Sequence, residues 1–239
     1  MPLLSHNQSW RFTTVNDNIL STYYILDLDR TLLDTESAAL LMRDAASWSN
    51  ADLAAQLTQK INDSSLYGES FSIRDFIVEQ VGEEGLVAIE AKYRELMLNK
   101  DVLNPGAQEL IDYIHTLPDA VWGILTYGSQ SGQTLKIEAS GLGSSLYLVT
   151  HETFKGDQIT SWRDENGLYH LPEELGGYIT KKIVFVDDKP FSFKGLAADC
   201  RGYWVKSLFD AGKESLPSNV TPIQSLLEVI ALEKQLSTN

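Results

Sequence analysis

The sequence predicts an α/β protein in which a parallel sheet has helices on both faces and an all-helical segment is inserted near the start. In the second half of the chain, short apolar runs typical of strands alternate with helical patterns. By contrast, apolar residues in the segment from Glu36 to Leu98 recur at three- and four-residue spacing, and no strand pattern interrupts them. We therefore expect a Rossmann-like core and a helical cap domain, and a chain of 239 residues with 43% hydrophobic content can bury such a core.

The first expected strand covers residues 23–26, with the sequence YYIL. Aromatic and β-branched residues without polar alternation are typical of a parallel strand buried on both faces. Asp27 follows this strand directly, and Asp29 lies two residues further on. The carboxyl end of such a strand is where α/β sheets bind ligands, so Asp27 is expected to be in a functional site.

The helical segment is expected to form a cap over residues 35–103, inserted directly behind the first strand. The catalytic core is then discontinuous, made of residues 1–34 and 104–239. Residues 1–21 show no clear periodicity, and we make no functional prediction for them.

The core is expected to resume with a helix that has Asn104 as N-cap and Pro105 in its first turn. Apolar runs then predict strands at 120–125, 146–149, 183–186 and 202–205, with helices at 131–140 and near 223–236. Between the strands, an Asn166-Gly167 pair within residues 161–172 indicates a β-hairpin excursion.

The composition limits which binding partners and which cellular compartment we expect. The formal net charge of −14 argues against nucleic acid and anionic membrane surfaces as partners, whereas a small anionic substrate remains possible. Cys200 is the one cysteine, which excludes an intrachain disulfide and favours a reducing compartment. Since no apolar run is long enough to span a membrane and the first 22 residues are too polar for a secretory signal, we expect a cytoplasmic protein.

Polar groups suited to phosphate chemistry follow four of these expected strands or lie in adjoining loops. They are Asp27 and Asp29 after the first strand, Thr126 after the second, Lys155 after the third, and the pair Asp187 and Asp188 after the fourth. In order and spacing, this set resembles the haloacid dehalogenase superfamily, and specifically its phosphatase-like members with an inserted helical cap. Their motifs are an Asp-x-Asp-x-Thr turn, a Ser or Thr after a second strand, a Lys, and an acidic pair after a third strand.

The resemblance implies Mg²⁺ as cofactor, held by the carboxylate of Asp27, the main-chain carbonyl of Asp29, and one or both of Asp187 and Asp188. Carboxylate and carbonyl oxygens are the ligands that suit this ion. It also implies phosphomonoester hydrolysis of a small phosphorylated metabolite, because a cap over the cleft obstructs large substrates.

The residues support this chemistry in physical terms. Asp27 would attack phosphorus to give an aspartyl-phosphate, while Asp29 would protonate the leaving oxygen and later activate water. To act as an acid near neutrality, Asp29 needs a pKa raised by burial or by a neighbouring negative charge. Thr31 would hold the Asp29 turn through its hydroxyl.

Three groups are expected to bind the transferring phosphoryl group. Thr126 and Lys155 would contact its oxygens, and Gly128 would let the backbone approach them closely. Lys189 is the second choice for the lysine, whereas Lys136, in an expected helix, is disfavoured. The oligomeric state stays open.

Two other functions are compatible with the same residues. A phosphomutase of the same superfamily would use all of them, and a non-catalytic phosphate-binding protein would keep the fold without turnover. Arg30 is the main departure from the superfamily pattern, because a small residue is common between the second aspartate and the threonine. Its guanidinium could bind substrate, point away, or lower the pKa of Asp29.

Overall fold

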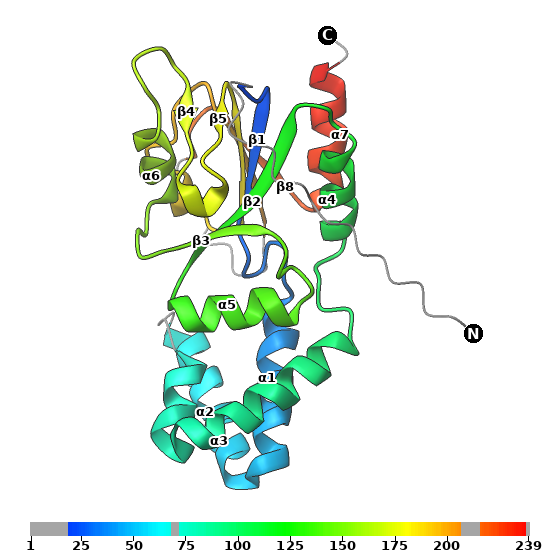
Figure 1. Cartoon of the computed structure of the whole chain (residues 1–239), viewed down its shortest axis with the longest axis vertical. Coiled ribbons are helices and arrows are strands. Elements are labelled where there is room, and N and C mark those ends of the chain that lie inside the picture. Colours follow the sequence, from blue (N-terminus) through cyan, green and yellow to red (C-terminus); the bar gives the residue numbers. More distant parts are fainter. Residues whose placement is uncertain (1–18, 68–71, 207–215, 238–239) are drawn as a thin grey trace, which may run out of the picture.

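A six-stranded parallel sheet forms the centre of the computed structural model, which describes residues 19–67, 72–206 and 216–237 (Figure 1). The strand order is β3-β2-β1-β6-β7-β8, and each neighbouring pair is parallel. The strands are β1 (Thr22–Leu26), β2 (Ala120–Tyr127), β3 (Leu146–Thr150), β6 (Ile183–Asp187), β7 (Arg201–Val205) and β8 (Val220–Ile223). The predicted α/β class with a parallel sheet is therefore confirmed.

Strand β1 lies between β2 and β6, and its side chains alternate between two apolar clusters. Tyr24 and Leu26 pack into the cluster that also holds residues of α4 (Ala107–His115) and α7 (Leu226–Ser237). Tyr23 and Ile25 pack on the opposite face with α6 (Lys155–Ser161), η1 (Glu173–Leu175) and η2 (Pro190–Phe193). Both faces of the sheet are thus covered, which explains why the YYIL run carries no polar residue.

Helices α1 (Thr35–Ser49), α2 (Ala51–Tyr67) and α3 (Ile73–Leu98) form a separate group, which we call the helical lobe (Figure 1). Helix α1 packs against both α2 and α3, and α3 also contacts α5 (Gln130–Ala139), which follows β2. Buried residues recur at helical spacing on the inner faces, such as Leu53 and Leu57 in α2 and Leu86 and Ile89 in α3. The expected run of helices is therefore present, and the division at residues 35 and 103 stays a prediction.

The predicted N-cap at Asn104 is wrong. Helix α4 begins at Ala107, and its N-cap is Gly106 in the left-handed conformation with a φ of 87°. The side chain of Asn104 instead donates hydrogen bonds to the main-chain oxygens of Thr31 and Leu33. Asn104 therefore connects the segment before α4 to the turn after β1.

The predicted hairpin at 161–172 is only partly correct. An isolated antiparallel bridge joins Arg163 to Tyr169 around the Asn166-Gly167 turn. The regular pairing, however, is between β4 (Tyr169–His170) and β5 (Ile179–Thr180), which lies outside the predicted range. The sequence prediction also missed β8, a strand that contains a proline at residue 222.

In the part of the chain that the structure describes, no helix combines the length and apolar character that crossing a membrane requires.

Candidate active site

The candidate site lies at the carboxyl edge of the three central strands. Asp27 follows β1, Thr126 is near the end of β2, and Asp187 is the last residue of β6. The amide of Asp27 donates a hydrogen bond to the main-chain oxygen of Val186, so the ends of β1 and β6 are joined at this point. Parallel strands bring their carboxyl ends to one edge, and here this edge brings together residues far apart in the sequence.

Three buried carboxylates form a cluster that can hold a metal ion. One oxygen from each of Asp27, Asp187 and Asp188 lies within 4.8 Å of the others. The Oδ1 atom of Asp188 is buried and accepts no hydrogen bond from the described residues, which is unfavourable for a carboxylate unless a cation or proton is supplied. An oxygen-rich, buried donor set of this kind fits Mg²⁺.

Lys155 supplies positive charge within the same cluster. Its side chain, only 4% exposed, places Nζ 2.5 Å from Oδ1 of Asp27 and 2.8 Å from Oδ2 of Asp187. Lys155 is the first residue of α6, in the connection that follows β3. The lysine chosen from the sequence therefore lies beside the proposed nucleophile, and Lys189 is not needed for that position.

Burial by itself raises the pKa values of the aspartates in the cluster and lowers that of Lys155. Desolvation, reinforced by Asp187 and only partly offset by Lys155, raises the pKa of Asp27 to about 6. Desolvation and the charges of Asp27 and Asp187 raise the pKa of Asp188 to about 8. Burial would lower the pKa of Lys155, but its two carboxylate partners outweigh burial and raise it.

Thr126 and Gly128 occupy the end of β2 beside the cluster. The Thr126 hydroxyl is buried and has no hydrogen-bond partner among the described residues. Gly128 has a φ of 149°, and a Cβ atom there would lie 2.6 Å from Nε2 of Gln133. The positive φ and the nearby side chain of Gln133 therefore favour glycine at this position, and the amide of Gly128 donates to the main-chain oxygen of Thr150.

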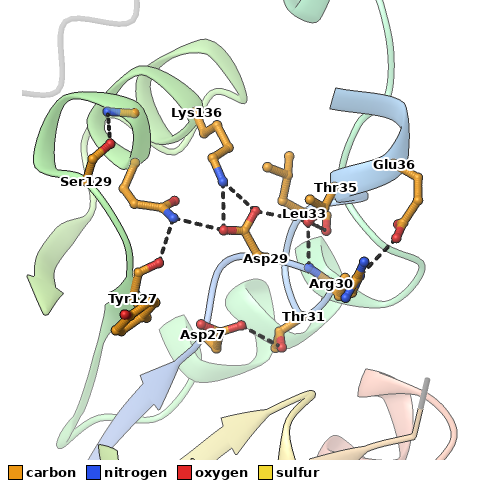
Figure 2. A network of polar contacts seen from close by, with 12 residues as sticks. Asp27, Asp29, Arg30, Thr31, Leu33, Thr35, Glu36, Tyr127, Ser129 and Lys136 are labelled. Carbon is orange, nitrogen blue, oxygen red and sulfur yellow. Dashed lines mark hydrogen bonds and ion pairs between the residues drawn. The ribbon is translucent and has the colours of Figure 1, made fainter. Parts of the chain in front are cut away.

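The hydroxyl of Thr31 has a different partner from the one expected. It donates a hydrogen bond to Oδ2 of Asp27 at 3.2 Å, rather than holding the Asp29 turn (Figure 2). The contact to Asp29 comes from Thr35, whose hydroxyl lies 3.0 Å from Oδ1 of Asp29 and also accepts the amide of Arg30. Thr31 therefore positions the first aspartate, and Thr35 positions the second.

Asp29 does not join the acidic cluster. Its carboxylate faces α5, where Nζ of Lys136 lies 2.6 and 2.7 Å from its two oxygens (Figure 2). Nε2 of Gln133 lies 3.0 Å from Oδ2 of Asp29. Burial alone would raise the pKa of Asp29, but the charge of Lys136 and the hydrogen bonds from Lys136, Gln133 and Thr35 lower it. The expected raised pKa of Asp29 is therefore wrong for this conformation, because Lys136, on a helix that the sequence did not place at the site, pairs with its carboxylate.

Arg30 points away from both aspartates. It has a positive φ of 62°, which is unusual for a residue with a side chain, and its amide donates to the main-chain oxygen of Leu33. Its guanidinium lies 2.9 Å from Oε1 of Glu36 at the start of α1. The cation that lowers the pKa of Asp29 is therefore Lys136, and Arg30 contributes the unusual backbone of the turn.

A cavity of about 310 Å³ opens beside Asp29, between the helical lobe and α5. The lobe contributes apolar and aromatic groups, including Ala38, Met42 and Tyr93, together with Arg74. The core contributes Lys136, Gly128 and Asp188, so the cavity reaches the acidic cluster. A small molecule could bind here with one end at the cluster and the other at the lobe.

The fold occurs in solved structures of known class. A protein from Burkholderia xenovorans LB400 described as a haloacid dehalogenase-like hydrolase is 17% identical, with 90% of this chain and 98% of that chain covered and a TM-score of 0.60. A protein from Thermotoga maritima described as a beta-phosphoglucomutase is 15% identical, with 90% and 99% covered and a TM-score of 0.54. CbbY from Rhodobacter sphaeroides, solved in complex with phosphate, is 15% identical, with 88% and 96% covered and a TM-score of 0.50.

No family model and no curated protein matches the sequence. The structural similarity nevertheless identifies the class of fold: the chain has a haloacid dehalogenase-like fold. The expected resemblance is confirmed at that level, whereas the roles of individual residues stay predictions.

Proposed function

We propose that this protein is a Mg²⁺-dependent phosphomonoester hydrolase that acts on a small phosphorylated metabolite through an aspartyl-phosphate. The observation that carries this proposal is the position of Asp27, which is buried at a strand end beside Lys155 and two further aspartates. The cavity lined by Asp29 and by Asp188 of the cluster accommodates a small leaving group. The structural neighbour crystallised with phosphate is consistent with a phosphate ester as ligand.

In the proposed first step, a carboxylate oxygen of Asp27 attacks phosphorus, an oxygen–phosphorus bond forms, and the ester bond to the leaving oxygen breaks. Asp29 gives a proton to that oxygen. In the second step Asp29 takes a proton from water, which attacks phosphorus and releases phosphate from Asp27. Asp29 can do this only after its carboxylate leaves Lys136 and, for the first step, takes up a proton from solvent, because the ion pair keeps it ionised. The arrangement described above is therefore a resting state in this proposal.

The other residues stabilise charge. Lys155 and the buried hydroxyl of Thr126 would donate to the phosphoryl oxygens, and Gly128 would let the backbone approach them closely. Thr31 would keep the Asp27 carboxylate oriented for attack. Asp27, Asp187, Asp188 and the main-chain carbonyl of Asp29 would hold Mg²⁺, which when bound supplies positive charge to the phosphoryl oxygens and to the acidic cluster.

The helical lobe would act as the cap, with residues 35–103 inserted into a core of residues 1–34 and 104–239. Its apolar residues line one side of the cavity, so closure of the lobe would exclude water and select the leaving group. A cytoplasmic location is consistent with this proposal, because the chain has a single, buried cysteine, Cys200.

One observation favours a second candidate. Because Asp29 is paired with Lys136 and not aimed at the cluster, a phosphate-binding protein without turnover would show the same arrangement. A phosphomutase would use the same residues as the hydrolase but return the phosphoryl group to a second hydroxyl of the sugar.

The test is Mg²⁺-dependent release of phosphate from p-nitrophenyl phosphate by the wild-type chain and by Asp27→Asn. We expect release by the wild type and none by the variant. Phosphate binding without release would identify the binding protein, and bisphosphate-dependent isomerisation of a sugar phosphate would identify the mutase. Full activity in Asp27→Asn would reject Asp27 as nucleophile.

A further inference from the structure

The ion pair between Asp29 and Lys136 forms part of the cavity wall. Both residues line the cavity, and their side chains are 23% and 25% exposed. The ammonium of Lys136 has three donors, and the hydrogen bonds that it makes with described side chains go to the two oxygens of Asp29. A third donor is therefore left for water or for a molecule in the cavity.

In the proposed reaction, which the present inference builds on, Asp29 has to turn from α5 toward the leaving oxygen. Lys136 then loses the anion that it contacts in this structure. A partly buried ammonium that loses its partner while the lobe excludes water is unfavourable, unless another anion takes the vacated position. Substrate binding is the event that can bring such an anion.

The two arginines of the cavity are bound differently from Lys136, and Lys189, its other lysine, adjoins Asp188 of the acidic cluster. The guanidinium of Arg74 lies 3.0 Å from Oε1 of Glu90 within the lobe, and that of Arg30 lies 2.9 Å from Glu36. Neither pair involves a residue with a role in the proposed reaction, so neither has to break during turnover. Lys136 differs because its partner, Asp29, is the proposed acid and base.

On the lobe side, the cavity has apolar side chains as well as the polar residues Ser72 and Arg74. Met42, Ala38 and Tyr93 line it, and they can pack against a short carbon chain without requiring polar groups from it. A ligand that fits this cavity would thus have a phosphoryl group at the acidic cluster, a short carbon chain against the lobe, and its second polar group at Lys136.

We propose that Lys136 is a specificity-determining residue, and that the substrate is a phosphate monoester whose leaving group carries a second anionic group, a carboxylate or another phosphate. This group replaces Asp29 as the partner of Lys136 and so frees Asp29 to reach the leaving oxygen. A substrate with a neutral leaving group leaves the ion pair between Asp29 and Lys136 intact.

The test measures binding with ligands that cannot be hydrolysed, so that its result is independent of turnover. Alkylphosphonates are compared by calorimetry with ω-carboxyalkylphosphonates and with alkane bisphosphonates of the same chain length, over a homologous series. We expect the ligands with a second anionic group to bind roughly tenfold more tightly than the alkylphosphonates at the best chain length, as a charge-assisted hydrogen bond predicts. The two kinds of second anion distinguish a carboxylate from a phosphate as the recognised group.

Variants test whether Lys136 causes the preference for ligands with a second anionic group. Lys136→Met should abolish the preference, and Lys136→Arg, which keeps the charge, should retain most of it. Lys189→Met is the matched control, because Lys189 also lines the cavity, and the preference should survive in it. Equal binding of neutral and anionic ligands by the wild type would overturn the proposal, as would a preference lost in Lys189→Met but kept in Lys136→Met. If no phosphate ester is hydrolysed but the preference is found, the proposed function fails while the anion site stands.

Discussion

The ammonium of Lys155 lies 2.5 Å from Oδ1 of Asp27, inside a site where both side chains are almost fully buried. The same nitrogen lies 2.8 Å from Asp187, so one cation contacts two carboxylates of the acidic cluster. Charges out of contact with water depend on such partners, because the surrounding protein solvates them poorly. The proposed nucleophile is therefore held by a group that also stabilises the folded cluster.

Replacement of Lys155 by methionine should destabilise the protein strongly in EDTA. It leaves the carboxylates of Asp27 and Asp187 buried without their cation, and such a loss typically lowers the free energy of unfolding by about 3–5 kcal/mol. Urea denaturation measures this quantity. Lys92→Met, which removes a surface lysine paired with Glu95, should change it by less than about 1 kcal/mol, and a similarly small effect at Lys155 would contradict the described burial.

Thr126→Val should separate stability from activity. The hydroxyl of Thr126 is buried without a partner, so its loss should leave the free energy of unfolding unchanged or slightly higher. Activity should nevertheless fall by roughly tenfold or more, because a donor to the phosphoryl oxygens is removed. Thr180→Val is the matched control: that buried hydroxyl donates to the main-chain oxygen of Lys182, and its loss should destabilise the protein by about 1 kcal/mol. Unchanged activity in Thr126→Val would remove Thr126 from the site.

Thr31→Val should reduce activity through Asp27. The hydroxyl of Thr31 donates to the second oxygen of that carboxylate, and a hydrogen bond to a charged group is worth about 1.5–3 kcal/mol. We therefore expect kcat/KM to fall by roughly tenfold or more in Thr31→Val, and Thr31→Ser, which keeps the hydroxyl, to recover most of it. Equal loss in both variants would indicate that the methyl group matters and the hydroxyl does not.

Asp188→Asn should stabilise the metal-free protein in a pH-dependent way. Burial and two neighbouring carboxylates raise the pKa of Asp188 from 3.8 to about 8, so the folded protein binds a proton that the unfolded chain releases within this window. Its contribution to stability is complete below the lower value and is lost as pH rises toward the upper one. In EDTA, the variant should match the wild type at low pH and exceed it increasingly up to about pH 8.

Urea denaturation at several pH values checks this difference, and Mg²⁺ supplies the control. The ion should stabilise the wild type most at the upper end of the window, where the carboxylates are ionised, and stabilise Asp188→Asn less. A stability difference between the two chains that does not depend on pH would contradict the assigned pKa shift.

The parts of the fold and site that could be predicted from sequence are those set by local patterns. The apolar runs before Asp27 and before Asp187 each specify one strand, and the helical spacing in residues 36–98 specifies the helices of the lobe. Parallel pairing then brings the strand ends together. Lys155 could be predicted as a site residue because it follows the strand expected at residues 146–149. Strand β8 was not predicted because it is short and contains a proline, which lowers strand propensity.

The environment of Asp29 could not be predicted in the same way. Its pKa depends on Lys136 and Gln133, which approach from a helix more than a hundred positions along the chain. The available signal was their spacing of three residues, which places both on one face of α5, the helix after the second strand. Which face a helix turns toward a site is decided by packing, so only the folded structure shows that this face meets Asp29.

The central claim, that Asp27 carries the phosphoryl group during turnover, is tested most directly by acid quenching. The wild-type chain with Mg²⁺ is mixed with a phosphate monoester labelled in its phosphoryl group, quenched within the first turnovers, and its peptides are mapped. We predict acid-stable, alkali-labile label on the peptide that contains Asp27, and none in Asp27→Asn. Hydrolysis without labelled protein, or label on a different side chain, would contradict the account.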